Sequence, residues 1–232
     1  MFIEIKDAVK KYGSADNCVY ALNNASLSVE QGEICVILGH SGSGKSTMLN
    51  MLGGLDTLDS GSITVAGNNI TSFSGKALTE YRRENVGFVF QFYNLIPDLT
   101  VAENIKVIAD VSKDPMDLNE LLKVLGIEKI AHRFPNEISG GQQQRVAIAR
   151  AMIKKPKVLL CDELTGALDS SSARDVLRLV QKVNQEYGTT ILIVTHNEEI
   201  KKMADRYIQI RDGKVVVNEV QTEKASVEEM SL

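Results

Sequence analysis

The sequence predicts an α/β domain built on a mostly parallel sheet that helices cover on both faces. Short apolar runs typical of buried strands alternate with segments of helical spacing, and three such runs span residues 34–38, 158–161 and 191–194. A polar motif follows each of these runs. Because ligands bind beyond the carboxyl ends of the strands in such sheets, we expect the three motifs to meet at one edge.

The remaining elements are assigned from periodicity and turn residues. Further strand candidates occupy residues 2–6, 25–29, 62–65 and 86–90. Helical spacing or helix-forming residues mark residues 46–52, 118–125, 145–153 and 176–187. Asp212 and Gly213 separate two alternating runs, residues 207–210 and 214–217, and so predict a short hairpin.

Composition places the chain among ordinary globular proteins. Its 232 residues suffice for one large domain or two small ones, with no need for disulfides or metals to stabilise the core. The shares of hydrophobic residues (44%) and charged residues (24%) are those of a typical globular domain. The formal net charge of −4 disfavours a protein whose main task is to hold nucleic acid.

The cysteines and the N-terminus bear on location. Cys18, Cys35 and Cys161 form no C-x-x-C pair and favour a reducing compartment, here the cytosol. Residues 1–6 have neither the basic start nor the apolar core of a signal peptide. No apolar run approaches the ~20 residues that span a bilayer, so we expect a chain that does not cross a membrane by itself.

Residues 39–46 carry the phosphate-loop pattern G-x-x-x-x-G-K-[ST] between a buried strand and a helix. Gly42 and Gly44 let the backbone turn so that successive N–H groups can face phosphate oxygens. The helix start adds unpaired donors, Lys45 an ammonium for the β- and γ-phosphates, and Ser46 a hydroxyl for Mg²⁺. The structural alternative is a Gly/Ser-rich turn that happens to contain a lysine.

Asp162 and Glu163 follow the apolar run 158–161 directly. A carboxylate there can hold Mg²⁺, and its neighbour can polarise a water for in-line attack on a γ-phosphate. We assign Asp162 to the metal and Glu163 to the water. The alternative is an acidic pair that caps a strand-to-helix turn.

A second loop precedes the helix that includes residues 145–153. Ser139 and Gln142 have capping-box spacing, and Gly140 and Gly141 leave backbone N–H groups uncovered. This helix start is therefore either an anion site or only a well-capped helix.

Three further side chains are ambiguous when each is taken alone. His196 follows the run 191–194 and can hydrogen-bond a γ-phosphate or the attacking water, although a lone histidine is more often structural. Gln91 has an amide able to reach Mg²⁺ and water. Tyr12 can stack on a purine or simply pack on the surface.

Taken in chain order, these motifs resemble those of the nucleotide-binding subunit of an ATP-binding cassette (ABC) transporter. The matching segments are Tyr12 (adenine-stacking loop), 39–47 (Walker A), Gln91 (Q-loop), 139–142 (signature), 158–163 (Walker B), 167–169 (D-loop) and His196 (switch histidine). The signature at Ser139 separates this family from other phosphate-loop enzymes.

The resemblance implies a role for each matched residue. Catalytic roles fall to Glu163, His196 and Gln91, and contacts to Mg²⁺ to Ser46, Gln91 and Asp162. Residues implied to bind ATP are Tyr12, Gly39, Ser41, Gly42, Ser43, Gly44, Lys45, Ser46, Thr47, Ser139, Gly140, Gly141 and Gln142.

The resemblance also implies an architecture. The expected fold is a P-loop NTPase (RecA-like) core with an N-terminal antiparallel β subdomain and an inserted helical subdomain. We expect the ATP-binding domain to cover residues 1–218, with the helical subdomain at roughly 95–153. Residues 219–232 are polar and acidic and are expected to form a frayed tail.

The activity implied is Mg²⁺-dependent ATP hydrolysis in a head-to-tail homodimer, with each ATP between the Walker motifs of one copy and Ser139 of the other. A separate membrane permease would hold the subunit on the inner face of the cell membrane. Residues 90–100 and 164–169 are similar to the macrolide-export and lipoprotein-release branch, which implies export of peptides, lipoproteins or drugs. Alternatives are a cassette that drives a signalling or cell-division complex without transport, or a soluble ATPase acting on nucleic acid or ribosomes. The acidic balance argues against nucleic acid.

Two positions bear on the match with the family pattern. Leu164 stands where the family usually has proline, which restores a backbone N–H and loosens φ on the way into the D-loop. His40 occupies a variable Walker A position, and we assign it no chemistry.

Overall fold

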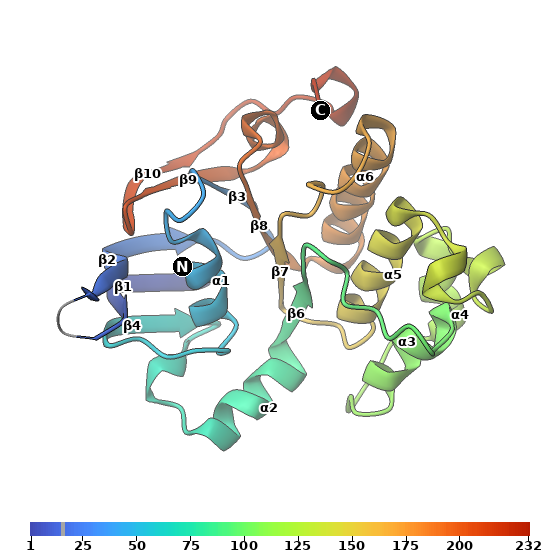
Figure 1. Cartoon of the computed structure of the whole chain (residues 1–232), viewed down its shortest axis with the longest axis horizontal. Helices are drawn as coiled ribbons and strands as arrows, with labels where there is room; N and C mark the ends of the chain where they lie inside the picture. Colours follow the sequence, from blue (N-terminus) through green and yellow to red (C-terminus); the bar gives the residue numbers. More distant parts are fainter. Residues whose placement is uncertain (15–16) are drawn as a thin grey trace.

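Two β-sheets and a group of helices make up the computed structural model, which describes residues 1–14 and 17–232 (Figure 1). One sheet is antiparallel, in the order β2-β1-β4-β5. Its strands are β1 (Ile3–Tyr12), β2 (Val19–Val29), β4 (Ser60–Val65) and β5 (Asn68–Asn69). This sheet is the expected N-terminal antiparallel subdomain.

The second sheet has six strands in the order β10-β9-β3-β8-β7-β6. All its pairs are parallel except β10 with β9. Its strands are β3 (Ile34–Leu38), β6 (Val86–Val89), β7 (Val158–Asp162), β8 (Thr190–Thr195), β9 (Arg206–Arg211) and β10 (Lys214–Val220). The mostly parallel sheet predicted from the buried runs is thus confirmed.

Helices flank this sheet on both faces. Figure 1 shows α1 between the two sheets, with α3, α4 and α5 gathered on the opposite side. The α-helices are α1 (Lys45–Leu52), α2 (Gly75–Asn85), α3 (Val101–Ala109), α4 (Leu118–Val124), α5 (Gly140–Met152) and α6 (Ser170–Tyr187). Short 3₁₀ turns are η2 (Ile70–Ser72), η3 (Glu128–Ile130), η4 (Pro135–Glu137), η5 (Glu198–Met203) and η6 (Val227–Glu229).

The buried strands divide their side chains between two cores. In β3, Cys35 and Ile37 pack toward α1 and the antiparallel sheet, whereas Val36 and Leu38 pack toward the helices on the other face. Successive side chains of a strand point to opposite faces, so a strand covered on both sides reads as an unbroken apolar run. The runs in the sequence therefore reflect burial on two faces.

The first two strands extend further than the alternation suggested. The pairing of β1 with β2 continues to Tyr12 and Val19, but it is interrupted by irregularities near Asp7 and Asn24, which have φ of 48° and 50°. A bulge shifts the side-chain alternation by one residue, so the period-2 pattern is lost beyond it. The extension carries Tyr12 to the far end of the antiparallel sheet.

The predicted hairpin is confirmed and touches the loop between β3 and α1. Asp212 and Gly213 have φ of 50° and 74°, as a two-residue type I′ turn requires. The Gly213 N–H donates to the Ser43 carbonyl at 3.0 Å, and the Asn23 N–H donates to the Gly213 carbonyl at 2.9 Å. The hairpin tip thus braces this loop against β2.

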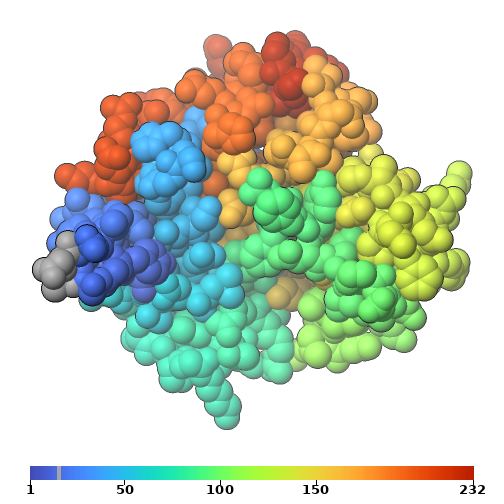
Figure 2. All heavy atoms as spheres, in the orientation of Figure 1, coloured from blue at the N-terminus to red at the C-terminus, as the bar shows by residue number. Residues whose placement is uncertain are grey.

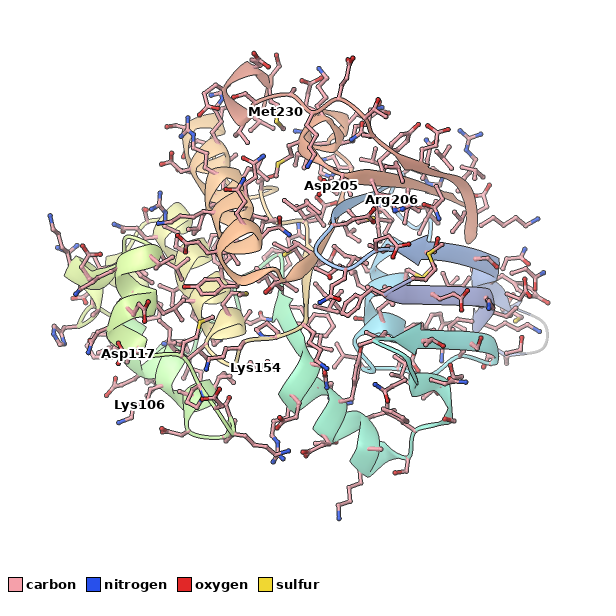
Figure 3. All side chains as sticks on the ribbon, turned by 180° about the vertical axis from the view of Figure 1, so that it is seen from behind. Lys106, Asp117, Lys154, Asp205, Arg206 and Met230 are labelled. Carbon is pink, nitrogen blue, oxygen red and sulfur yellow. The ribbon has the colours of Figure 1, made fainter. Side chains whose placement is uncertain are left out.

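The expectation of a frayed tail from residue 219 is wrong. Strand β10 continues to Val220, and both Val227 and Met230 are only 1% exposed. The Arg178 Nε donates to a Glu228 carboxylate oxygen at 2.6 Å, and the Arg174 guanidinium donates to the Met230 carbonyl at 3.1 Å. Figure 1 shows this end of the chain beside α6, and Met230 is labelled in Figure 3. Two buried apolar side chains, together with these hydrogen bonds, fix the segment against α6.

None of the helices formed by residues 1–14 and 17–232 combines the length and apolar character that crossing a bilayer requires.

Replacing Met230 tests the packing of the C-terminal segment. Met230→Ala should lower the free energy of unfolding by about 2 kcal/mol, because it removes a buried side chain at the edge of a core. Urea unfolding measures the change. The matched control is Glu223→Ala, an exposed residue of the same segment, which should stay within about 0.5 kcal/mol of the parent. Equal effects from both variants would contradict the packing described here.

A pair of glycine variants tests the loop that precedes α1. Gly44 has φ of +109°, and a Cβ there would lie 2.3 Å from the Ala21 carbonyl oxygen. Gly44→Ala should therefore lower the free energy of unfolding by about 3 kcal/mol, from backbone strain and a clash. Gly42 also has positive φ (+77°) but has open space around it, so Gly42→Ala should cost about 1–2 kcal/mol. Equal costs in thermal or urea unfolding would show that the Ala21 contact is unimportant.

Candidate functional site

A cavity of about 610 Å³ lies at the carboxyl ends of β3, β7 and β8. It is lined by Val19, Ala21, Ser41, Gly42, Gly44, Lys45, Ser46, Thr47, Gln91, Asp162, Glu163 and His196. The structure thus brings together residues of the phosphate loop, the acidic pair, the glutamine and the histidine. It does so because the parallel strands end side by side.

The phosphate loop closes over the ammonium of Lys45. Lys45 Nζ donates to the carbonyls of Gly39 and His40, at 2.7 and 2.8 Å. Burial lowers the pKa of Lys45, although the nearby charges of Glu163 and Asp162 act to raise it. The charged form of this side chain is therefore poorly solvated, and an anion in the cavity would stabilise it.

Asp162 and Ser46 are neighbours on the wall of the cavity. Ser46 Oγ donates to Asp162 Oδ1 at 3.3 Å. Burial, and to a lesser extent the charge of Glu163, raises the pKa of Asp162. A cation beside this carboxylate would offset both effects.

These oxygens suit a magnesium ion better than a metal with a full protein cage. Within residues 1–14 and 17–232, no three His, Cys, Asp or Glu side chains gather as a metal site. Mg²⁺ usually takes one or two protein oxygens and completes its shell with water and substrate phosphates. Ser46, Asp162 and Gln91, all lining one cavity, offer such a partial set.

Glu163 is held in place from its backbone and from its side chain. Its φ of 49° is left-handed, and its N–H donates to the Val194 carbonyl at 2.9 Å. His196 Nδ1 lies 3.0 Å from one carboxylate oxygen and 3.1 Å from the other. The Glu163 side chain is 15% exposed and that of His196 70%. The carboxylate therefore lines the cavity in an orientation set by its backbone and by a more exposed partner, His196.

The loop at residue 139 forms the predicted capping box. Ser139 Oγ accepts from the Gln142 N–H at 3.3 Å, and the Gln142 side chain accepts from the Ser139 N–H at 2.9 Å. A Cβ on Gly140 would lie 3.2 Å from the Tyr93 hydroxyl, and one on Gly141 would lie 3.2 Å from Ser172. The glycines thus allow close packing, while Ser139 remains exposed.

Ser139, Gly140, Gly141 and Gln142 do not line the cavity that holds the other motifs. They begin α5, on the side of the six-stranded sheet opposite α1 (Figure 1). The sequence alone did not reveal this separation.

Tyr12 lies beside the cavity without lining it. It pairs in register with Val19, which does line the cavity, and its side chain is 44% exposed. Its hydroxyl donates to Asp56 at 2.8 Å. Val19 and Ala21 add an apolar wall that sequence reasoning missed, because β2 was expected to begin at residue 25.

The segment that follows Glu163 turns directly into α6. Leu164 is 1% exposed and belongs to the helix-side core. Asp169 caps α6 by accepting from the N–H groups of Ser171 and Ser172, both at 3.0 Å. Leucine in place of proline therefore anchors this turn by burial of its side chain.

Comparisons with known proteins identify the family. The model of the ABC transporter family matches residues 22–166. The chain is 48% identical over 202 residues to a putative ABC transporter ATP-binding protein, the MG467 homologue of Mycoplasma pneumoniae, covering 86% of this chain and 60% of that protein. It is 43% identical over 230 residues to the macrolide export ATP-binding/permease protein MacB of Shigella flexneri, covering 97% of this chain and 35% of that protein.

Solved structures agree. The dimeric post-hydrolysis structure of the ATP-binding cassette MJ0796 bound to ADP and Pi superposes with a TM-score of 0.85 at 38% identity, covering 94% of this chain and 98% of that one. CbiO1 of Clostridium perfringens, described as part of the ABC transporter complex CbiONQ, gives 0.83 at 28% identity, covering 98% and 89%. The expected fold is confirmed, and the chain belongs to the ABC transporter family.

Proposed function

We propose that this chain is the Mg²⁺-dependent ATPase subunit of an ABC transporter and that it powers a membrane permease. The main support for this proposal is that one cavity is lined by Lys45, Gln91, Asp162, Glu163 and His196. A cation for phosphate, oxygens for a metal and a carboxylate for water are the parts that phosphoryl transfer needs.

Each residue has a task in hydrolysis. Lys45 exchanges its loop carbonyls for the β- and γ-phosphate oxygens, and the loop N–H groups surround those phosphates. Glu163 accepts the proton of the attacking water, and His196 orients this carboxylate through its Nδ1. Mg²⁺ held by Ser46, Gln91 and Asp162 would neutralise charge on the phosphate oxygens.

A second copy of the chain completes the site. Ser139 is exposed and lies outside the cavity of its own chain, and its helix begins at Gly140 and Gly141, whose N–H groups have no partner within the helix. In a head-to-tail dimer this helix start would meet the γ-phosphate on the other copy. The dimeric, nucleotide-bound MJ0796 supports this arrangement by similarity.

A groove between α2 and α3 is the proposed docking site for the permease, and a hollow lies there in Figure 2. Its volume is about 270 Å³, and its walls include Phe88 and Phe90, whose rings stack 5.2 Å apart, as well as Val107. Half-buried aromatic rings beside an exposed aliphatic side chain form a surface that suits an apolar helix from a partner.

The groove also carries positive charge. Arg150 donates to the Tyr93 carbonyl at 2.7 Å, and Lys154, labelled in Figure 3, donates to the Arg82 carbonyl at 2.7 Å. Burial lowers the pKa of Lys154 to about 8. A partner helix with acidic side chains among apolar ones would complement these groups.

The relatives favour export within this function. MacB combines ATP-binding and permease segments for macrolide export, and this chain spans only about a third of its length. We place the chain in this branch, with peptides, lipoproteins or drugs as cargo, and on the cytoplasmic face of the membrane beside its permease. The alternatives without transport find no support in the comparisons.

Substitution of Glu163 tests the activity. Glu163→Gln should bind ATP as the parent does but hydrolyse it about 10²–10⁴-fold more slowly, because the general base is lost. Phosphate release and equilibrium titration measure the two effects. Lys45→Ala is the contrasting variant, because it should weaken ATP binding itself. Near-parent turnover of Glu163→Gln would remove this residue from its role.

The same variant reports on the dimer. With ATP and Mg²⁺, Glu163→Gln should elute from gel filtration as a dimer, because the nucleotide that joins the copies persists. Ser139→Arg in this background should restore the monomer while leaving ATP bound. A dimer that is indifferent to Ser139→Arg would exclude the head-to-tail arrangement.

Two exposed valines test the docking groove. Val107 (42% exposed) lines the groove, whereas Val111 (58% exposed), just beyond α3, does not. Val107→Asp should reduce the fraction of the chain that sediments with permease-containing membranes by more than about tenfold, since it replaces apolar contact surface with a carboxylate that repels the acidic side chains expected on the partner. Val111→Asp should leave this fraction unchanged, and ATP hydrolysis without membranes should be normal for both. Equal retention of both variants would place the permease elsewhere.

A further inference from the structure

Asp56 receives hydrogen bonds from three donors that belong to two different segments. The Tyr12 hydroxyl donates to Oδ2 at 2.8 Å, and Lys10 Nζ and the Thr57 N–H donate to Oδ1 at 2.8 and 2.7 Å. Lys10 Nζ also donates to the Thr57 carbonyl at 2.8 Å. The Lys10 side chain is 11% exposed and that of Asp56 35%. Hydrogen bonds to an ionised acceptor in a sheltered place are among the stronger ones.

These bonds join the end of β1 to the end of α1. Helix α1 begins at Lys45 in the phosphate loop and ends at Leu52, and Asp56 lies four residues further on. A second link is parallel to the first, since the Lys11 N–H donates to Asp59 Oδ2 at 2.6 Å. One end of α1 therefore carries the phosphate site, and the turn after its other end holds Tyr12.

The orientation of Tyr12 is set by these contacts. Lys10 Nζ lies 5.1 Å from the centroid of the Tyr12 ring, so the lysine covers part of the ring. The residue is still 44% exposed, and its strand partner Val19 lines the cavity. Burial and then the bond to Asp56 raise the pKa of Tyr12, which keeps its hydroxyl a donor. The ring is thus held at the rim of the cavity with free surface for a purine.

We propose that Asp56 is a positioning residue for the nucleotide base: it fixes the Tyr12 ring at a set distance from the phosphate loop. The inference rests on the proposed function, because it assumes that the cavity binds ATP. An aromatic ring that is already immobilised loses less rotational freedom when a base stacks on it, and this raises affinity. Asp56 itself does not line the cavity.

The test compares the affinities of two anions. Asp56→Ala should raise the dissociation constant for ATP about tenfold, the worth of one hydrogen bond to a charged group. The constant for inorganic tripolyphosphate, which has no base, should stay within about twofold of the parent. In hydrolysis the KM for ATP should rise while kcat at saturating ATP changes little, because the base contributes to binding and not to the chemical step.

Further variants separate positioning from general stability. Tyr12→Phe keeps the ring and loses its anchor, so it should match Asp56→Ala, and the double variant should be no weaker than the weaker single one. Asp56→Asn keeps one oxygen acceptor, which can serve either Tyr12 or the pair Lys10 and Thr57 but not both, so its affinity for ATP should lie between those of the parent and Asp56→Ala. Asp59→Ala is the matched control: it breaks the neighbouring link to Lys11 without touching Tyr12, and it should leave the preference for ATP over tripolyphosphate unchanged.

Each outcome decides the proposal. Selective loss of ATP affinity with non-additive singles supports it. Equal loss for tripolyphosphate, additive effects of the two singles, or the same selective loss in Asp59→Ala would overturn it in favour of a purely structural ion pair. If Asp56→Ala fails to fold, Tyr12→Phe and Asp56→Asn still give the comparison. A parent chain that binds tripolyphosphate but not ATP would overturn the proposed function as well, and so the two failures are distinguishable.

Discussion

The parallel register of β3, β8 and β7 is the constraint on which the rest of the structure depends. Leu38 is paired with Thr195, and Asp162 with Val194, so the three strands end at the same level. The Glu163 N–H continues the ladder by donating to the Val194 carbonyl at 2.9 Å. The phosphate loop thereby meets two carboxylates and a histidine that lie more than 100 residues further along the chain. The two cores on either side of the sheet hold this register, because a slip by one residue would exchange the core that each side chain enters.

Much of this sheet could be predicted because the information is local. The run 34–38 is buried on both faces and so reads as unbroken apolar sequence, and the turn at Asp212 and Gly213 has only one common solution. The outer parts of β1 and β2 could not be predicted, since bulges there remove the alternation. The order of the C-terminal segment could not be predicted for a different reason. Val227 and Met230 are buried by α6 and its neighbours, which lie far away in the sequence.

The candidate site also has one part that could be predicted from the sequence and another that could not. The phosphate loop and the acidic pair are continuous motifs whose places follow from the strands that carry them. The separation of Ser139 from the cavity, and the apolar wall of Val19 and Ala21, depend on how distant segments pack, and no local pattern encodes either. Some of the predicted nucleotide-binding residues therefore lie apart from the others. Tyr12 and Ser139 both lie outside the cavity, and we assign them to the base and to the second copy.

Burial acts on the two main charges of the cavity in opposite directions, and this bears on what the cavity binds. It lowers the pKa of Lys45 and raises that of Asp162, so each charged form lacks the solvation it would have in water. Lys45 is bonded to loop carbonyls, and Asp162 to the Ser46 hydroxyl; neither neutral partner cancels a charge. An anion alone would stabilise the charged lysine but repel the carboxylate, whereas a cation alone would stabilise the carboxylate but repel the lysine. A triphosphate bound together with magnesium would satisfy both groups at once, which supports the proposal that the cavity binds the metal–nucleotide complex.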